Sequence, residues 1–151
     1  MKTLVVDQSK CAGCRICELW CSLQHEQVAN PALSRIKIVR SHANYFCLPV
    51  TCTQCVNPPC VSSCPNQALS QDEQTGGILA DLEKCIGCRK CLKACPNAAI
   101  SFHTQTRKAI TCDLCSGRPI CVTRCPMGAL QYIDSAYAHR PSLENIARHN
   151  K

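Results

Sequence analysis

The sequence CIGCRKCLKACP, residues 85–96, decides the fold of this 151-residue chain. Four cysteines and a closing proline make up five of the twelve residues in this stretch. Three further stretches repeat the pattern with small changes, so that 16 of the 17 cysteines fall into four quartets. The quartets are Cys11, Cys14, Cys17 and Cys21; Cys52, Cys55, Cys60 and Cys64; Cys85, Cys88, Cys91 and Cys95; and Cys112, Cys115, Cys121 and Cys125.

The spacing C-x2-C-x2-C-x3-C-P of the third quartet is typical of a site for a [4Fe–4S] cluster. Each of the four irons takes one soft thiolate, and two-residue gaps let three cysteines of one loop reach three irons. The fourth cysteine ligates a neighbouring cluster, and we expect it at the start of a short helix. A proline then ends the loop (Pro65, Pro96 and Pro126), whereas Ser22 takes its place in the first quartet. The sequence therefore predicts four [4Fe–4S] clusters.

Other uses of cysteine fit the spacing less well. Structural zinc takes paired C-x2-C units that are separated by a longer spacer. A disulfide scaffold favours an even number of cysteines and an exported chain, but the number here is odd. The loops between second and third ligands are longer in the second quartet (residues 56–59) and in the fourth (residues 116–120). We expect these loops at the surface, either as partner contacts or as tolerated insertions.

The formal net charge of +7 counts every cysteine as neutral. An oxidised cubane with its thiolates carries about −2, so four of them leave the loaded chain near neutral. Seven basic residues near the quartets are expected to compensate this charge: Arg15, Lys84, Arg89, Lys90, Lys93, Arg118 and Arg124. The sequence has no basic run with interleaved aromatic residues, so it does not favour nucleic acid as a partner. Without a signal-peptide core or an apolar stretch of membrane-spanning length, we expect a cytoplasmic location.

Strands, cysteine loops and short helices alternate along the chain. We expect strands at residues 4–7, 35–40, 46–51, 78–81 and 130–133, a helix at 17–25, and a hairpin of 99–103 with 109–111. The predicted fold class is α+β, with two nested bacterial-ferredoxin-like units of short strands and helices around four cubanes. The inner unit is 46–103, the outer unit is 1–45 with 104–133, and 134–151 is a tail. A helix capped by Ser142 either frays there or docks on another subunit.

Nesting predicts four mixed ligand sets, because each fourth cysteine turns to the neighbouring cluster. We name them sets A to D. Set A is Cys11, Cys14, Cys17 and Cys125; set B is Cys112, Cys115, Cys121 and Cys21. Set C is Cys52, Cys55, Cys60 and Cys95; set D is Cys85, Cys88, Cys91 and Cys64. Two clusters are neighbours within each unit, so the chain forms a wire with two ends.

The nested quartets resemble the four-cluster iron–sulfur subunits of molybdenum and tungsten oxidoreductases, over about residues 1–133. Relatives serve formate dehydrogenases, dimethyl-sulfoxide-reductase-type enzymes, carbon monoxide dehydrogenases and hydrogenases. Some of them replace one ligand by tryptophan and hold a three-iron cluster. Here all sixteen positions are cysteine and Trp20 is an additional residue, so four cubanes are expected.

The segment CRICELWCSLQHE, residues 14–26, with Asn30-Pro31 and Ser34-Arg35-Ile36 after it, narrows this resemblance. It is similar to the small iron–sulfur subunit of tungsten-dependent aldehyde oxidoreductases. The resemblance implies a large catalytic partner that holds a tungsten or molybdenum bis-pterin and a cubane of its own. Electrons would pass to ferredoxin, a flavin subunit using NAD or another acceptor. Some relatives stack into filaments, so self-association is included in the expectation.

We therefore expect a non-catalytic electron-transfer subunit, since fully cysteine-ligated clusters leave no open position for a substrate. A freestanding polyferredoxin, the equivalent subunit of a formate dehydrogenase, carbon monoxide dehydrogenase or hydrogenase, and a cluster-dependent sensor are the alternatives. Cys47, the odd cysteine, is either a buried free thiol or an exchange ligand. His25 either packs in the fold or donates a hydrogen bond to a cluster or a partner.

Overall fold

A computed structural model describes residues 2–41 and 46–135 of the chain, and the tail helix expected from Ser142 lies outside them. The described strands form four separate two-stranded antiparallel sheets. β1 (Lys2–Val6) pairs with β8 (Leu130–Asp134), and β2 (Lys37–Ser41) with β3 (Phe46–Val50). β4 (Leu69–Gln71) pairs with β5 (Ile78–Ala80), and β6 (Ser101–Phe102) with β7 (Ala109–Ile110). The expected strands are confirmed within a few residues, and β4 is an addition that the sequence pattern did not indicate.

The helices are short and belong to the cysteine loops. α1 (Ile16–Glu26) is the longest, followed by α3 (Lys90–Ala94), α2 (Pro59–Ser62) and α4 (Ile120–Thr123). The described residues also include three 3-10 turns: η1 (Gln8–Lys10), η2 (Pro31–Leu33) and η3 (Leu114–Gly117).

The expectation that each fourth cysteine starts a helix is wrong. In the last three quartets the helix carries the third cysteine and ends before the fourth. Proline excludes the helical conformation from the residue that precedes it, and Cys95, before Pro96, is extended with φ −75° and ψ 116°. The first quartet has Ser22 instead of proline, and α1 therefore continues past Cys21 to Glu26.

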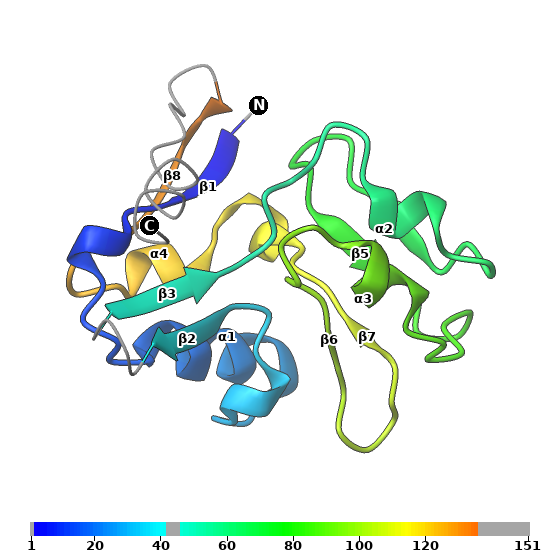
Figure 1. The fold of residues 1–151 in the computed structure, drawn as a ribbon, viewed down its shortest axis with the longest axis horizontal. Helices are drawn as coiled ribbons and strands as arrows, with labels where there is room; N and C mark the ends of the chain where they lie inside the picture. The colour runs from blue at the N-terminus through cyan, green and yellow to red at the C-terminus, as the bar shows by residue number, and fades with distance from the viewer. Residues whose placement is uncertain (1, 42–45, 136–151) are drawn as a thin grey trace.

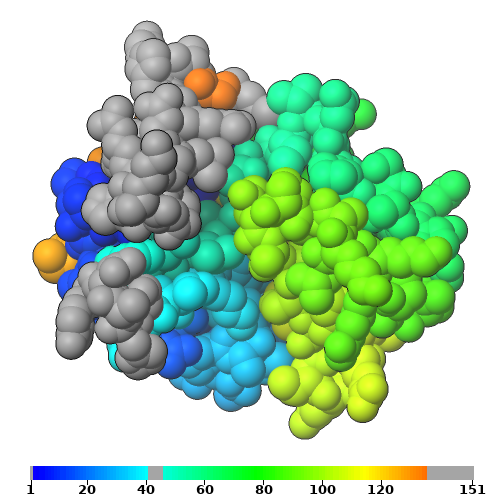
Figure 2. Space-filling view, viewed as in Figure 1, coloured from blue at the N-terminus to red at the C-terminus, as the bar shows by residue number. Residues whose placement is uncertain are grey.

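Two hydrophobic cores organise the described residues. The first joins the two ends of the described chain: Leu4, Cys17, Cys21, Ile36, Leu114, Cys121 and Leu130. The second lies in the middle of the sequence: Cys60, Leu69, Ile78, Cys91, Ile100 and Ala109. Figure 1 shows the corresponding halves, with β1, β8, β2, β3, α1 and α4 on one side and α2, α3 and the β6–β7 hairpin on the other. On the surface in Figure 2, blue and cyan atoms lie on the left and green atoms on the right, and the two regions are in contact along the middle of this face.

The two halves meet along the chain that leads into the fourth quartet. The Ile78 backbone N–H donates to the Cys112 carbonyl at 2.9 Å. Gly77 packs so closely on Asp113 that an added Cβ would lie 2.6 Å from the Asp113 carbonyl oxygen. A side chain at residue 77 would therefore separate the halves. In the ranges 2–41 and 46–135, the helices are too short or too polar to cross a bilayer.

Candidate metal centres

Three cavities are each lined by the four cysteines of one predicted ligand set, which come from two quartets. Cys52, Cys55, Cys60 and Cys95, which are set C, line the first cavity. Set D, Cys64, Cys85, Cys88 and Cys91, lines the second. Set A, Cys11, Cys14, Cys17 and Cys125, lines the third. In each cavity one cysteine comes from the quartet that supplies the neighbouring set.

The four cysteines of set B lie together around the packing of α1 against the fourth quartet. Cys21 and Cys121 are buried in the first core, and Cys112 packs against it. Cys115 lies beside the last turn of α1, where its Sγ is 3.9 Å from His25 Nε2. Cys112 also lines the set C cavity, so sets B and C are adjacent across the junction of the two halves.

The thiols of each set are close enough to influence one another. Burial, and then mutual repulsion within set C, raises the pKa of Cys52 to about 11. In set D the pKa of Cys91 is raised to about 11, again by burial first and then by Cys85, Cys88 and Cys64. Burial followed by Cys112, Cys21 and Cys115 raises the pKa of Cys121. Four thiolates at such sites need bound cations to stay charged together, and the irons of a bound cluster would supply them.

Backbone N–H groups already point at several of these sulfurs. Arg35 N donates to Cys21 Sγ and Ala68 N to Cys64 Sγ, both at 3.3 Å. Ala99 N and Ala109 N lie 3.4 Å from the sulfurs of Cys95 and Cys85. Hydrogen bonds of this kind stabilise cluster sulfurs and tune their reduction potentials. The donor chemistry of the sites therefore fits [4Fe–4S] clusters, and the ligation of each set stays a prediction.

Left-handed backbone positions shape the first and third cysteine loops in the same way. Gly13 and Gly87 have φ of +67° and +70°, and the arginines two residues later, Arg15 and Arg89, have φ near +60°. A Cβ on Gly13 would lie 2.3 Å from the sulfur of Cys47. Close approach to a neighbouring segment, as well as the turn of the loop, therefore requires glycine here.

Cys47 and His25 gain contacts that the sequence left open. Cys47 lies in β3 opposite Arg40, and its sulfur packs against the first cysteine loop at Gly13. The side chain of His25 is 11% exposed and forms a hydrogen bond with Asp113, which follows Cys112 in the loop of the fourth quartet. Burial by itself lowers the pKa of His25, but Asp113, Cys115 and Cys21 raise it to about 12. The signal for His25 was its place four residues after Cys21, while no sequence signal marked Asp113.

The basic residues near the quartets are only partly free to face clusters. Arg15 pairs with the buried Glu18, and Lys84 pairs with Asp81 at 3.3 Å. Arg124 stacks 4.0 Å above the ring of Trp20, and Arg89 lies over Phe102. The expected charge compensation is thus shared with structural contacts.

The longer loops differ from each other. Val56 in the second quartet is 91% exposed, which confirms the surface position expected for that loop. In the fourth quartet Ser116 and Arg118 are exposed, but Pro119 is buried where α4 begins. The fourth loop is therefore only partly a surface feature.

The fold and the cysteine sites define an iron–sulfur protein of the polyferredoxin type. Residues 43–135 match the model of the 4Fe-4S dicluster domain family, and the chain belongs to that family.

Individual proteins are similar over nearly the whole chain. The polyferredoxin-like subunit of aliphatic sulfonate oxidoreductase from Pyrococcus furiosus is 42% identical, over 96% of this chain and 84% of its own. The putative electron transport protein YsaA of Escherichia coli K12 is 35% identical, over 97% and 93%. Among solved structures, the active site complex BamBC of Benzoyl Coenzyme A reductase with Benzoyl-CoA contains a chain with a TM-score of 0.55 and 23% identity, matched over 99% of this chain and 88% of that one. The likeness to that structure concerns the fold alone.

Proposed function

We propose that this chain is the electron-transfer subunit of an oxidoreductase complex and carries four [4Fe–4S] clusters on sets A to D. The observation that carries the proposal is the convergence of sixteen cysteines, far apart in sequence, on four places in the fold. When bound, the clusters would act as one-electron carriers. The chain's own residues hold them, exclude water from their buried sides and direct backbone N–H groups at their sulfurs. We assign no catalytic residue.

The contacts between sets support the linear order A, B, C, D. Sets A and B share the first core, sets C and D share the second, and Cys112 joins B to C. The two cysteines that are exposed, Cys14 and Cys88, belong to the outermost sets A and D. Each end also has an exposed apolar neighbour at its cavity, Met127 at set A and Ile86 at set D. These ends suit two docking surfaces, one for the electron donor and one for the acceptor.

The catalytic partner we propose is a large subunit of the tungsten-dependent aldehyde oxidoreductase type, with ferredoxin or a flavin subunit using NAD as acceptor. The segment at residues 14–26 supports this type. The Pyrococcus furiosus relative is named as a polyferredoxin-like subunit of an oxidoreductase, which supports a subunit role. The nested units, 46–103 inside 1–45 with 104–133, and a cytoplasmic location stay predictions.

Anoxic affinity purification of the tagged chain from its native cell tests the proposal. We expect a large subunit to co-elute with tungsten, roughly 16 iron atoms per small chain and additional iron from the partner's own cubane. If molybdenum or nickel co-elutes with a large subunit instead, the partner is a formate dehydrogenase, carbon monoxide dehydrogenase or hydrogenase and not an enzyme of the aldehyde oxidoreductase type. A lone small chain with iron and sulfide would instead favour a freestanding carrier.

Two matched variants locate the docking end. Ile86 is 67% exposed, and Ile86→Glu places a charge beside set D. Met127 is 50% exposed, and Met127→Glu places a charge beside set A. We expect one variant to lose the large subunit while the other keeps it, with iron content unchanged in both. Retention of the large subunit by both variants would show that neither end is the docking surface.

A further inference from the structure

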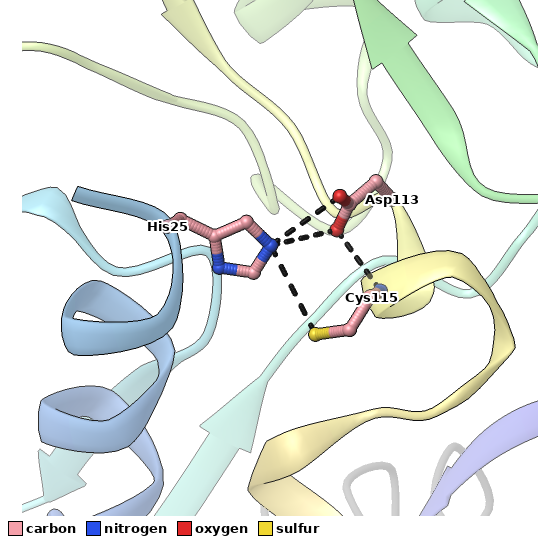
Figure 3. Close-up of side chains that lie close together, drawn as sticks. All are labelled: His25, Asp113 and Cys115. Carbon is pink, nitrogen blue, oxygen red and sulfur yellow. Dashed lines mark hydrogen bonds and ion pairs between the residues drawn. The ribbon is translucent and has the colours of Figure 1, made fainter. Parts of the chain in front are cut away.

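His25 lies between the two quartets that supply set B. It belongs to the last turn of α1, and its ring reaches Asp113 and Cys115, which precede and enter η3 (Figure 3). The Asp113 carboxylate also accepts from the Cys115 backbone N–H at 3.0 Å. The ring is thus fixed from both sides by residues of the set B loops.

Every partner of the His25 ring is a hydrogen-bond acceptor. Nδ1 lies 2.8 Å from the Cys21 carbonyl oxygen and 4.0 Å from its Sγ. Nε2 lies 3.0 and 3.3 Å from the two Asp113 carboxylate oxygens and 3.9 Å from Cys115 Sγ. Each ring nitrogen thus has an oxygen as its nearer partner and a cysteine sulfur as its farther one. The two oxygens hold the ring between one sulfur from each contributing quartet.

This arrangement distinguishes set B from the others. His103 is the other described histidine, and its ring accepts from the backbone of Gln105 and Thr106 without contacting a cysteine. In set C a side chain also approaches a sulfur, because the Thr53 hydroxyl lies 3.7 Å from Cys55 Sγ. A hydroxyl brings no ring and no orienting carboxylate. Hydrogen-bond donors near cluster sulfurs raise the reduction potential.

We propose that His25, oriented by Asp113, is a positioning residue that donates hydrogen bonds to the Cys21 and Cys115 sulfurs and raises the reduction potential at set B above the value it would otherwise have. The inference rests on the proposed function, because it requires a cubane at set B. His25, Asp113 and Cys115 also offer donor atoms within 4.8 Å of one another, as an ion site would. We assign Cys115 to the cubane, so that the histidine and aspartate act on the cluster's surroundings and hold no separate ion.

The test uses the complete chain, purified anoxically from cells fed ¹⁵N-histidine. Iron and sulfide content is measured first, and the clusters are then reduced and examined by pulsed EPR. We expect one cluster to show a weak hyperfine coupling to a histidine nitrogen, of the size transmitted through a hydrogen bond. A coupling of ligand size would mean direct ligation by histidine, and its absence from a fully loaded chain would overturn the inference.

Variants locate the effect. In His25→Gln we expect the coupling to disappear and one of the four midpoint potentials to fall, while the other three stay in place. His103→Gln is the matched control and should keep both the coupling and all four potentials. Unchanged potentials in a fully loaded His25→Gln protein, or loss of an additional non-cluster metal ion, would overturn the proposal. If His25→Gln loses the cluster altogether, the wild-type measurement tests the proposal: a weak histidine coupling supports it, and no coupling in a fully loaded chain overturns it.

The iron content separates the two levels of inference. A wild-type chain with iron and sulfide for four clusters but without a histidine coupling contradicts only the role of His25. A wild-type chain that assembles no cluster at set B contradicts the proposed function and the role of His25 together.

Discussion

Cys125 is the residue on which the separation of sets A and B depends. It lies far from Cys11 in the sequence, yet the two line one cavity. Its own quartet members Cys112 and Cys121 lie instead with Cys21. This crossing over of the fourth cysteine is the arrangement that two-cluster ferredoxins use.

Replacing Cys125 by serine tests the crossing directly. Because an oxygen ligand is a poor substitute for a thiolate on iron, we expect Cys125→Ser to change or remove the same EPR signal as Cys11→Ser. Up to roughly four of 16 irons are lost. Cys112→Ser should change a different signal, and the control Cys47→Ala should keep all the iron. If Cys125→Ser and Cys112→Ser affect one signal, the ligand sets are wrong.

At the scale of elements, a buried carboxylate connects α1 to β2. Glu18 is 1% exposed, it pairs with Arg15, and its Oε1 accepts from the Ile38 backbone N–H at 2.9 Å. The same helix carries Cys17, Cys21 and His25, so its seating on β2 affects both sets of the first core. The amphipathic pattern of α1 did not reveal this contact, because glutamate is normally an exposed helix residue.

We expect Glu18→Ala to destabilise the protein by about 1–3 kcal/mol, because it leaves the Ile38 N–H without its acceptor. Glu18→Gln retains an acceptor oxygen and should cost less. Glu26→Ala is the matched control on the same helix: it removes a more exposed pair with Arg35 and should cost about 0.2–1 kcal/mol. The measurement is the denaturant concentration at which half of the visible cluster absorbance is lost under anoxic conditions. Equal midpoints for Glu18→Ala and Glu26→Ala would contradict the structural role of Glu18.

At the scale of the whole molecule, the cluster ligands are part of the hydrophobic cores. Cys17, Cys21 and Cys121 belong to the first core, and Cys60 and Cys91 belong to the second. The four sheets have only two strands each, a size that is marginal without further packing. Metal binding should therefore be coupled to folding throughout the chain.

Removal of iron should unfold the chain. After treatment with a strong chelator under denaturing conditions and return to buffer, we expect the apo chain to be rapidly degraded by protease and to lack near-UV circular dichroism. Anoxic addition of iron and sulfide should restore both properties. The holo-protein carried through the same steps without chelator is the control. An apo chain that resists protease as well as the control would show that the polypeptide folds on its own.

The sequence by itself determined the class of cofactor, the α+β character and most strands, because cysteine spacing and alternating apolar residues are local properties of the chain. The early end of the short helices was also present in the sequence, since Pro65, Pro96 and Pro126 each act on the residue before them. The nesting of the quartets also predicted from the sequence which cysteines would lie together, and three cavities bring those same sets together. The tertiary structure alone decided why Gly13 must lack a side chain and that His25 meets Asp113. The contact of His25 with Asp113 joins residues 88 positions apart, and no local pattern encodes a partner that only tertiary packing brings near.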